Sequence, residues 1–192
     1  MPATHQGSNF SAVASFGVEG GGAVIEANYV TTKKGEFQMF MSHGEGLAST
    51  QAGAGYSMGV IEGKNFRRTS DFSGNYVQGS LGVNSSYVIG GSADAWGGVT
   101  TRKGKLPKYS GVWGYDFALT GGTPDPSGSL VFGNAIPANE VVDGALKKLK
   151  LSNTRFGQAY SKYAEKVTHF QLSGFGLFVC RTARQCGRSW TQ

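Results

Sequence analysis

The segment FSAVASFGV (Phe10–Val18) shows the pattern on which the fold prediction rests. Every second residue from Phe10 is apolar (Phe, Ala, Ala, Phe, Val), and successive side chains of a β-strand point to opposite faces. The same alternation recurs to about Gly133, in segments separated by clusters of Gly, Asn, Lys-Gly and Pro that are typical of turns. We therefore predict a half-buried strand at this segment and a series of similar strands after it.

Glycine content and turn spacing favour a curved antiparallel sheet. The 192-residue chain contains 31 glycines and five prolines, and glycine inside strands marks bends or close backbone approach, as in closed sheets. The turns predict about eight strands, at residues 9–18, 23–31, 36–43, 48–62, 71–83, 87–99, 109–119 and 128–134. Because the connections are short, we expect sequential strands to be antiparallel neighbours in a mainly β, up-and-down meander or barrel.

After Gly133 the pattern becomes helical. We predict a helix capped by Asn139, a second helix from Asn153 and a final strand at Phe170–Cys180, all packed on one face or open end of the barrel. The prediction divides the chain into two parts of one globular unit: residues 1–134, the glycine-rich antiparallel meander or barrel, and residues 135–192, a helix–helix–strand extension with a basic tail.

The positive charges of the predicted meander fall on one set of turns. Turns alternate between the two ends of such a sheet, and the even-numbered turns carry every Lys and Arg of the first 146 residues. These residues predict a basic rim that engages an anionic membrane surface or another polyanion; cations that only keep turns soluble are the alternative. Nucleic acid is less favoured because stacking aromatics are missing from these turns. The rim comprises Lys33, Lys34, Lys64, Arg67, Arg68, Arg102, Lys103, Lys105 and Lys108.

Aromatic residues on the predicted strands are candidates for the barrel interior. A small barrel is filled by side chains or holds one small ligand, so these rings either form the core or line a site for a flat apolar ligand. The candidates are Tyr56, Tyr76, Trp96, Trp113, Tyr115 and Phe117. An outer-membrane barrel fits less well, because alternate positions are often Gly or Ser and the helical third has no place in that plan.

The motifs do not indicate an enzyme. Gly55–Gly59 matches G-x-S-x-G, but it continues an alternating strand and no helix follows, as a nucleophile elbow requires. Cys180 and Cys186 are too few for a zinc site, and we expect no metal or cofactor. The competing hypothesis is an effector enzyme with a site between the meander and the C-terminal helices, using His43, His169 or Cys186.

The N-terminus has neither the basic head nor the apolar segment of a signal peptide, so we expect synthesis in the cytoplasm and any export to need no signal peptide. The glycine-rich texture resembles β segments of bacterial polymorphic (Rhs-type) toxins and related effectors over about residues 13–119. This resemblance implies a bacterial secreted or interbacterial context and transfers no functional residues. It is carried by Gly20–Ile25, Lys33–Gly35, Gly53–Tyr56, Phe72–Gly74 and Gly79–Val83.

Together these features predict a non-enzymatic binding or membrane-acting module, toxin- or effector-like, that engages an anionic, lipid-containing surface through its basic rim. A small-molecule carrier with an apolar ligand inside the barrel is a further alternative, and a homo-oligomer stays open.

Overall fold

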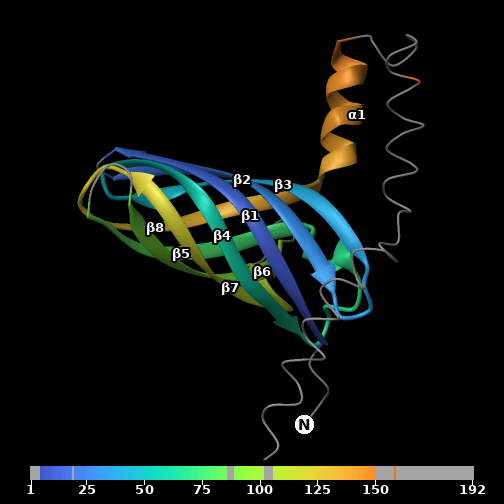
Figure 1. Ribbon diagram of the computed structural model, residues 1–192. Coiled ribbons are helices and arrows are strands. Elements are labelled where there is room, and N and C mark those ends of the chain that lie inside the picture. Colours follow the sequence, from blue (N-terminus) through green and yellow to red (C-terminus); the bar gives the residue numbers. More distant parts are fainter. Residues whose placement is uncertain (1–4, 19, 86–88, 102–105, 150–157, 159–192) are drawn as a thin grey trace, which may run out of the picture.

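The computed structural model describes residues 5–18, 20–85, 89–101, 106–149 and 158. In this part of the chain, eight antiparallel strands form a closed barrel, followed by one α-helix, α1 (Ala138–Lys148) (Figure 1). This confirms the mainly β fold and the eight-stranded antiparallel barrel. The strands are β1 (His5–Val18), β2 (Gly21–Thr32), β3 (Phe37–Ala48), β4 (Gln51–Gly63), β5 (Gly74–Asn84), β6 (Gly90–Thr100), β7 (Lys108–Gly122) and β8 (Pro126–Pro137).

The predicted up-and-down order of the strands is wrong. Around the barrel the order is β1-β2-β3-β8-β5-β6-β7-β4, so β3 and β4, β4 and β5, and β7 and β8 are not neighbours. The link from β3 to β4 runs over glycines of the β1–β2 hairpin instead. A Cβ at Gly17 would lie 2.4 Å from the Ser49 carbonyl oxygen, and one at Gly22 would lie 2.5 Å from the Ala48 Cβ. The short β3–β4 link can therefore cross the end of the β1–β2 hairpin because these glycines leave room for it.

The pairing register gives the barrel its tilt. A path through paired residues once around the wall starts at Gly17 of β1 and returns to β1 at Gly7, ten residues away. Between them it passes through Gly22, Gly46, Val131, Gln78, Trp96, Gly114 and Ile61. Over eight strands, this stagger corresponds to a strand tilt of about 40°. Strands of 11 to 15 residues then rise about 28–38 Å along the barrel axis.

Each strand is antiparallel to both neighbours, so the connections alternate between the two ends. The β2–β3, β4–β5 and β6–β7 connections lie at one end, which we call the basic end, and their described residues are 33–36, 64–73, 101 and 106–107. The described residues of the other connections (20, 49–50, 85, 89 and 123–125) lie at the far end and contain no Lys or Arg.

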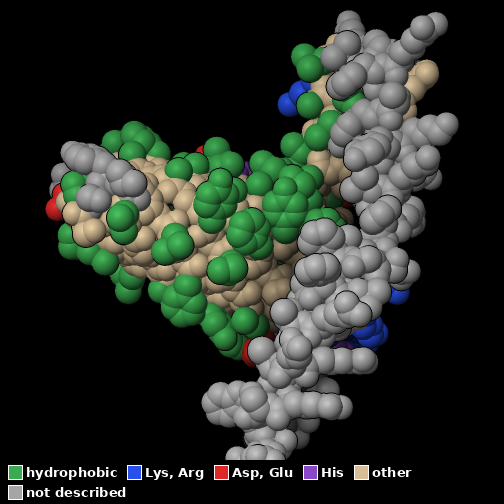
Figure 2. Space-filling view, in the orientation of Figure 1, with side chains coloured by type: hydrophobic (Ala, Val, Ile, Leu, Met, Phe, Trp, Pro, Cys, Tyr) green, Lys and Arg blue, Asp and Glu red, His purple; other side chains and the backbone are tan. Residues whose placement is uncertain are grey.

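The wall of the barrel is polar inside and apolar outside. Apolar side chains on alternate strand positions point outward and are distributed over the visible outside of the barrel, with backbone and other side chains between them (Figure 2). The alternation at Phe10–Val18 marks a strand, as predicted, but its Phe residues lie on the exposed face. We call the following exposed residues the outer belt: Phe10, Phe16, Ile25, Tyr29, Leu47, Tyr56, Met58, Leu81, Val83, Trp113, Tyr115, Phe117, Leu119, Leu130 and Phe132.

An apolar plug occupies part of the lumen near the basic end. The β4–β5 connection, which contains the 3₁₀ helix η1 (Thr69–Phe72), inserts Phe66 among buried strand residues. Phe66 is 1% exposed, and a Cβ at Gly7 would lie 2.5 Å from its ring, so this glycine makes room for it. The plug consists of Val30, Phe40, Ile61, Phe66 and Val112, with Phe72 and Trp96 packed against it.

Of the predicted helix–helix–strand extension, only the first helix lies among the described residues. α1 continues directly from β8 at the basic end and projects away from the barrel (Figure 1). Its N-cap is Pro137, with no side-chain capping bond, so the prediction of Asn139 as the N-cap is wrong: β8 runs to Pro137, and Asn139 lies inside the first turn. The second helix from Asn153 and the strand at Phe170–Cys180 lie outside the described residues.

Candidate functional site

Polar side chains that point into the lumen form one hydrogen-bonded network in the middle of the barrel. The Asn9 Nδ2 donates to Asn28 Oδ1 at 3.1 Å and to Asp116 Oδ1 at 3.3 Å. The Asn28 Nδ2 donates in turn to Ser42 Oγ at 2.9 Å and to Glu26 Oε2 at 3.3 Å. These bonds connect β1, β2, β3 and β7 through side chains alone.

Two further bonds extend this lumen network to β5 and β6. The Gln78 Nε2 donates to Glu26 Oε1 at 3.2 Å, and the Trp96 Nε1 donates to Asp116 Oδ2 at 3.1 Å. Glu26 and Gln78 stand on strands separated by β3 and β8, so their bond crosses the lumen. Side-chain networks of this kind rigidify an interior when their members are satisfied.

The network contains carboxylates that no described cation balances. Glu26 and Asp116 lie in it, and Asp94 of β6, which bonds Ser80, acts on both through its charge. The described residues that line the adjoining cavity include no Lys, Arg or His. Like charges at short range disfavour one another, and burial disfavours each of them. The lumen is therefore suited to a positively charged or hydrogen-bond-donating occupant.

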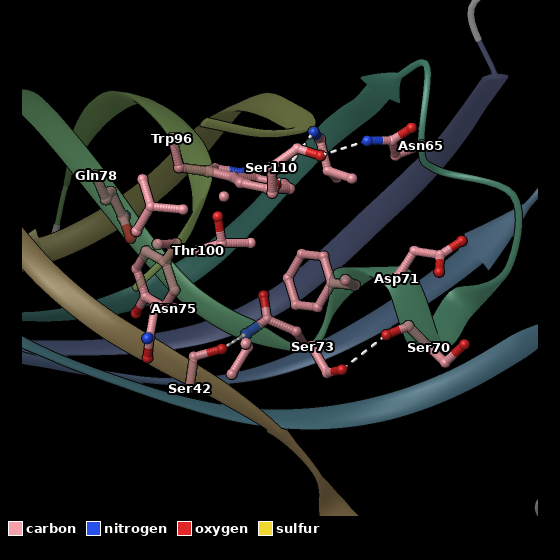
Figure 3. Close-up of a pocket in the computed structure, with 18 of the residues that line it drawn as sticks. Ser42, Asn65, Ser70, Asp71, Ser73, Asn75, Gln78, Trp96, Thr100 and Ser110 are labelled. Atoms are coloured by element: carbon pink, nitrogen blue, oxygen red, sulfur yellow. Dashed lines mark hydrogen bonds between the residues drawn. The ribbon is translucent and has the colours of Figure 1, made fainter. Parts of the chain in front are cut away.

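A cavity of about 490 Å³ leads from the basic end to this network. Figure 3 shows Asn65, Ser70 and Asp71 of the β4–β5 connection on one side of it, with Gln78 and Trp96 on the other. Its outer wall is exposed, as at Asn65 and Ser70, and its inner wall contains the buried network residues. Towards the far end the lumen narrows to a space of about 60 Å³ lined mostly by small and polar residues, with Asp94 among them.

The loop beside the cavity is fixed by its own hydrogen bonds. The Asp71 Oδ2 accepts the backbone N–H groups of Arg67 at 2.7 Å and Arg68 at 2.8 Å. Thr69 is tied to β3, where its hydroxyl donates to Gln38 Oε1 at 3.0 Å. The mouth therefore has a defined wall on this side.

Glycines on the lumen face make room for the network. A Cβ at Gly59 would lie 1.9 Å from Asp116 Oδ1, and one at Gly114 would lie 2.6 Å from the Trp96 ring. Such distances are shorter than side chains tolerate, so a larger residue would displace the carboxylate or the indole. The high glycine content thus reflects space for large polar and aromatic groups in a narrow lumen.

The outer belt is interrupted on one side by a polar stripe, formed by His43 and Glu45 of β3, Asn75 of β5 and Asn134 of β8. The Asn134 Nδ2 donates to Asn75 Oδ1 at 2.8 Å, so these two amides partly satisfy each other. Glu45 and His43 are exposed. The stripe places a carboxylate on an otherwise apolar surface.

The predicted rim residues that the structure describes lie together at the basic end. They are Lys33, Lys34, Lys64, Arg67, Arg68 and Lys108. Arg102, Lys103 and Lys105 lie outside the described residues. The strand count therefore placed the described part of the rim at one end, although the strand order differs.

The predicted aromatic ligand site is divided between the two faces. Tyr76 and Trp96 line the lumen cavity. The other four candidates, Tyr56, Trp113, Tyr115 and Phe117, belong to the outer belt. Their outward position follows from strand parity, since they alternate with the inward residues Ser57, Gly114 and Asp116.

Catalytic candidates do not converge among the described residues. His43 lies on the outer face, whereas His169 and Cys186 lie outside the described part of the chain. Ser57 of the G-x-S-x-G match is buried in the strand and pairs with the Ser11 hydroxyl. Within the described ranges, no group of His, Cys, Asp or Glu side chains is arranged to hold a metal ion.

The sequence analysis missed the lumen acids. Glu26 and Asp116 occupy the strand parity opposite to large exposed residues such as Ile25, Tyr115 and Phe117. Asp94 shares its parity with Ser92 and Trp96 of β6. A charged residue in mid-strand on the small-residue face is the signal that would have found them.

Comparison with known proteins gave no match to a family model, a curated protein or a solved structure. Of the helices in the described residues, none has the length and apolar character needed to cross a bilayer.

Proposed function

We propose that this protein is a membrane-acting barrel that inserts into a lipid bilayer, with the outer belt against the acyl chains and the basic end at an anionic headgroup surface. The observation that carries the proposal is the inverted wall, in which aromatic and aliphatic side chains are exposed while Asn, Ser, Gln and Asp side chains are buried. Water-soluble proteins rarely expose contiguous apolar patches larger than a few hundred Å².

The dimensions of the barrel support insertion. An outer-membrane-type barrel has an apolar band about 25 Å tall and strands tilted by about 35–45°. The ten-residue stagger and the axial rise of about 28–38 Å match both values. Closure of the sheet satisfies every strand edge, which a lipid environment requires.

The ends of the barrel support an orientation. Tyr29 and Trp113 stand near the basic-end margin of the belt, where amphipathic rings prefer the headgroup interface. Cations near an anionic surface contribute about 1 kcal/mol each. The basic end therefore fits an anionic leaflet better than the far end does.

The frequent Gly and Ser residues on the strands do not oppose a membrane barrel once the inward and outward faces of each strand are known. The Gly and Ser positions that interrupt the apolar pattern lie mainly on the lumen side, where small polar residues are expected in a membrane barrel. The polar stripe is the feature that opposes insertion, and Glu45 is its costliest member.

Fluorescence quenching by brominated acyl chains tests the proposal, with the full chain added to preformed vesicles. We expect the protein to float with the vesicles and to be quenched. The chain has a third tryptophan, Trp190, so Trp190→Phe serves as the background. In this background, Trp113→Phe should remove most of the quenching because Trp113 is in the belt, whereas Trp96→Phe should retain it because Trp96 is in the lumen. Failure to float, or equal quenching with and without Trp113→Phe in this background, would falsify the proposal.

The orientation has a separate test. Lys34→Glu with Arg67→Glu should weaken binding to anionic vesicles by about 2 kcal/mol or more and leave binding to neutral vesicles unchanged. Equal losses on both vesicle types would remove the role of the basic end.

A further inference from the structure

The inner end of the lumen cavity holds two buried polar groups without partners among the described residues. They are the Asn9 side-chain oxygen and the Tyr76 hydroxyl. Asn9 is 4% and Tyr76 8% exposed, and both residues line the cavity. Since buried polar groups are nearly always hydrogen-bonded, each such exception calls for an explanation.

The orientation of the Asn9 amide follows from its surroundings. Its nitrogen lies between two acceptors, Asn28 Oδ1 and Asp116 Oδ1. Exchanging the amide oxygen and nitrogen would place an oxygen against both, which is repulsive. The Asn9 Oδ1 is therefore left as a free acceptor in a cavity wall that also contains the Glu26 carboxyl group. Asp116 does not line the cavity but accepts a hydrogen bond from the Asn9 amide.

The wall is consequently rich in acceptors, and its described residues include the acids Glu26 and Asp71 but no basic side chain. Burial raises the pKa of the Glu26 carboxyl to about 7, so a bound cation would favour its ionised form. Aromatic rings complete it. Phe72 and Trp96 meet edge to face with ring centroids 5.2 Å apart, and both line the cavity. Cations are attracted to the faces of such rings, most strongly to Trp.

We propose that this cavity binds a small organic cation, an ammonium compound with an apolar body. Its N–H groups would donate to Asn9 Oδ1 and to the Glu26 carboxylate, and its apolar body would contact Trp96 and Phe72. The Asp116 carboxylate, which accepts from Asn9 and Trp96, would attract the cation without touching it. The volume of about 490 Å³ lies in the usual range for small-molecule sites. The inference goes beyond membrane insertion and does not depend on it.

Two other occupants fit less well. An apolar ligand would leave the Asn9 Oδ1 and the Tyr76 hydroxyl without a hydrogen-bond partner, which costs free energy. A metal ion lacks a ligand set, because the described part of the chain groups no three His, Cys, Asp or Glu side chains for one.

The cations of the basic end lie near the mouth but are exposed, as at Lys64, Arg67 and Arg68. At physiological salt their field is screened within about 8 Å. They slow the entry of a cation without removing its attraction to the buried carboxylates.

Isothermal titration of the full chain in detergent micelles tests this site, with 2-phenylethylamine as the probe and 2-phenylethanol as its uncharged counterpart. We expect the amine to bind at least tenfold more tightly than the alcohol. Because this comparison uses the wild-type protein, it needs no variant to fold. No detectable amine binding, or equal affinities for the two probes, would overturn the proposal.

Variants then assign the residues. Glu26→Gln keeps the shape of the side chain but removes its charge, and it is expected to lower amine affinity at least tenfold while affinity for the alcohol stays unchanged. Asp116→Asn, which acts only through its charge behind Asn9, should lower amine affinity less, by about threefold. Glu45→Gln on the outer face is the matched control and should bind the amine as wild type does. Near-wild-type amine affinity in Glu26→Gln, with the near-UV circular dichroism of the native barrel, would exclude the proposed contact.

Discussion

The inner and outer faces of the barrel wall are built from the same strands but have opposite chemistry. On β7, the inward residues Gly114, Asp116 and Ala118 alternate with the outward Trp113, Tyr115 and Phe117. In a water-soluble barrel the large apolar set would face inward. The difference teaches that alternation identifies a strand with two unlike environments, but it does not say which of the two is the protein interior.

The plug is the one region where the inner face resembles the core of a soluble protein, so truncating it should have the largest effect. Phe66→Ala removes a ring that is 1% exposed and packed among Val30, Ile61 and Val112. We expect a loss of about 3–4 kcal/mol in the free energy of unfolding, measured by urea titration in micelles. Phe132→Ala on the outer belt should cost about 1 kcal/mol. Equal losses would erase the distinction between the two faces.

Charge on the outer belt should have the next largest effect. Phe117 is 65% exposed and pairs with Met58 and Ala93 in the middle of the belt. A lysine at the midplane of a lipid-facing surface costs about 2–4 kcal/mol, so Phe117→Lys should lower the inserted fraction in vesicle flotation. Leu106→Lys, at the basic end, should leave insertion unchanged. Full insertion of Phe117→Lys would show that this face does not meet lipid.

Features of the barrel that depend on residues close together in the sequence can be predicted from it, whereas features that depend on distant residues cannot. Strand positions and the alternation of turns between ends are local, and turn residues such as Lys33–Gly35 fix them. The strand order is not set by local sequence. It depends on the two-residue β3–β4 link, which crosses the end of the β1–β2 hairpin over Gly17 and Gly22. No short-range pattern encodes that crossing.

The candidate site was only partly predictable for the same reason. Tyr76 and Trp96 were chosen as aromatic residues beside glycines, and they do line the cavity. The acids Glu26 and Asp116 were passed over because each is a single charge in an apolar context. Their meaning emerges only when the closed sheet brings β2 and β7 into one hydrogen-bonded network.

The same substitution, Gly to Ala, should have different effects on stability on the inner and outer faces of the wall. Gly59 points into the lumen, where a Cβ would lie 1.9 Å from Asp116 Oδ1, whereas nothing lies within 4 Å of a Cβ at Gly79 on the outer face. We expect Gly59→Ala to destabilise the barrel by about 2 kcal/mol through overpacking. Gly79→Ala should be neutral or stabilise by about 0.5 kcal/mol, because alanine restricts the unfolded chain.

Urea titration of the two alanine variants in micelles provides the measurement. A tolerated Gly59→Ala combined with a destabilising Gly79→Ala would mean that the assignment of inward and outward residues on these strands is reversed.

The polar stripe offers the smallest and most informative change, since here the outer face departs from its own pattern. Glu45 is an exposed carboxylate on β3 whose pairing partner on β8 is the belt residue Phe132. Acidic residues cost less than basic ones on a lipid-facing surface, so we expect Glu45→Leu to favour insertion by about 1 kcal/mol in vesicle flotation. Glu62→Leu is the control, because Glu62 stands near the basic end and accepts a hydrogen bond from Gln6 Nε2 at 2.7 Å. A gain for Glu45→Leu alone places the stripe in lipid. Weaker insertion of Glu45→Leu would instead mean that the carboxylate has a favourable polar partner there, and that lipid contacts only the remaining part of the belt.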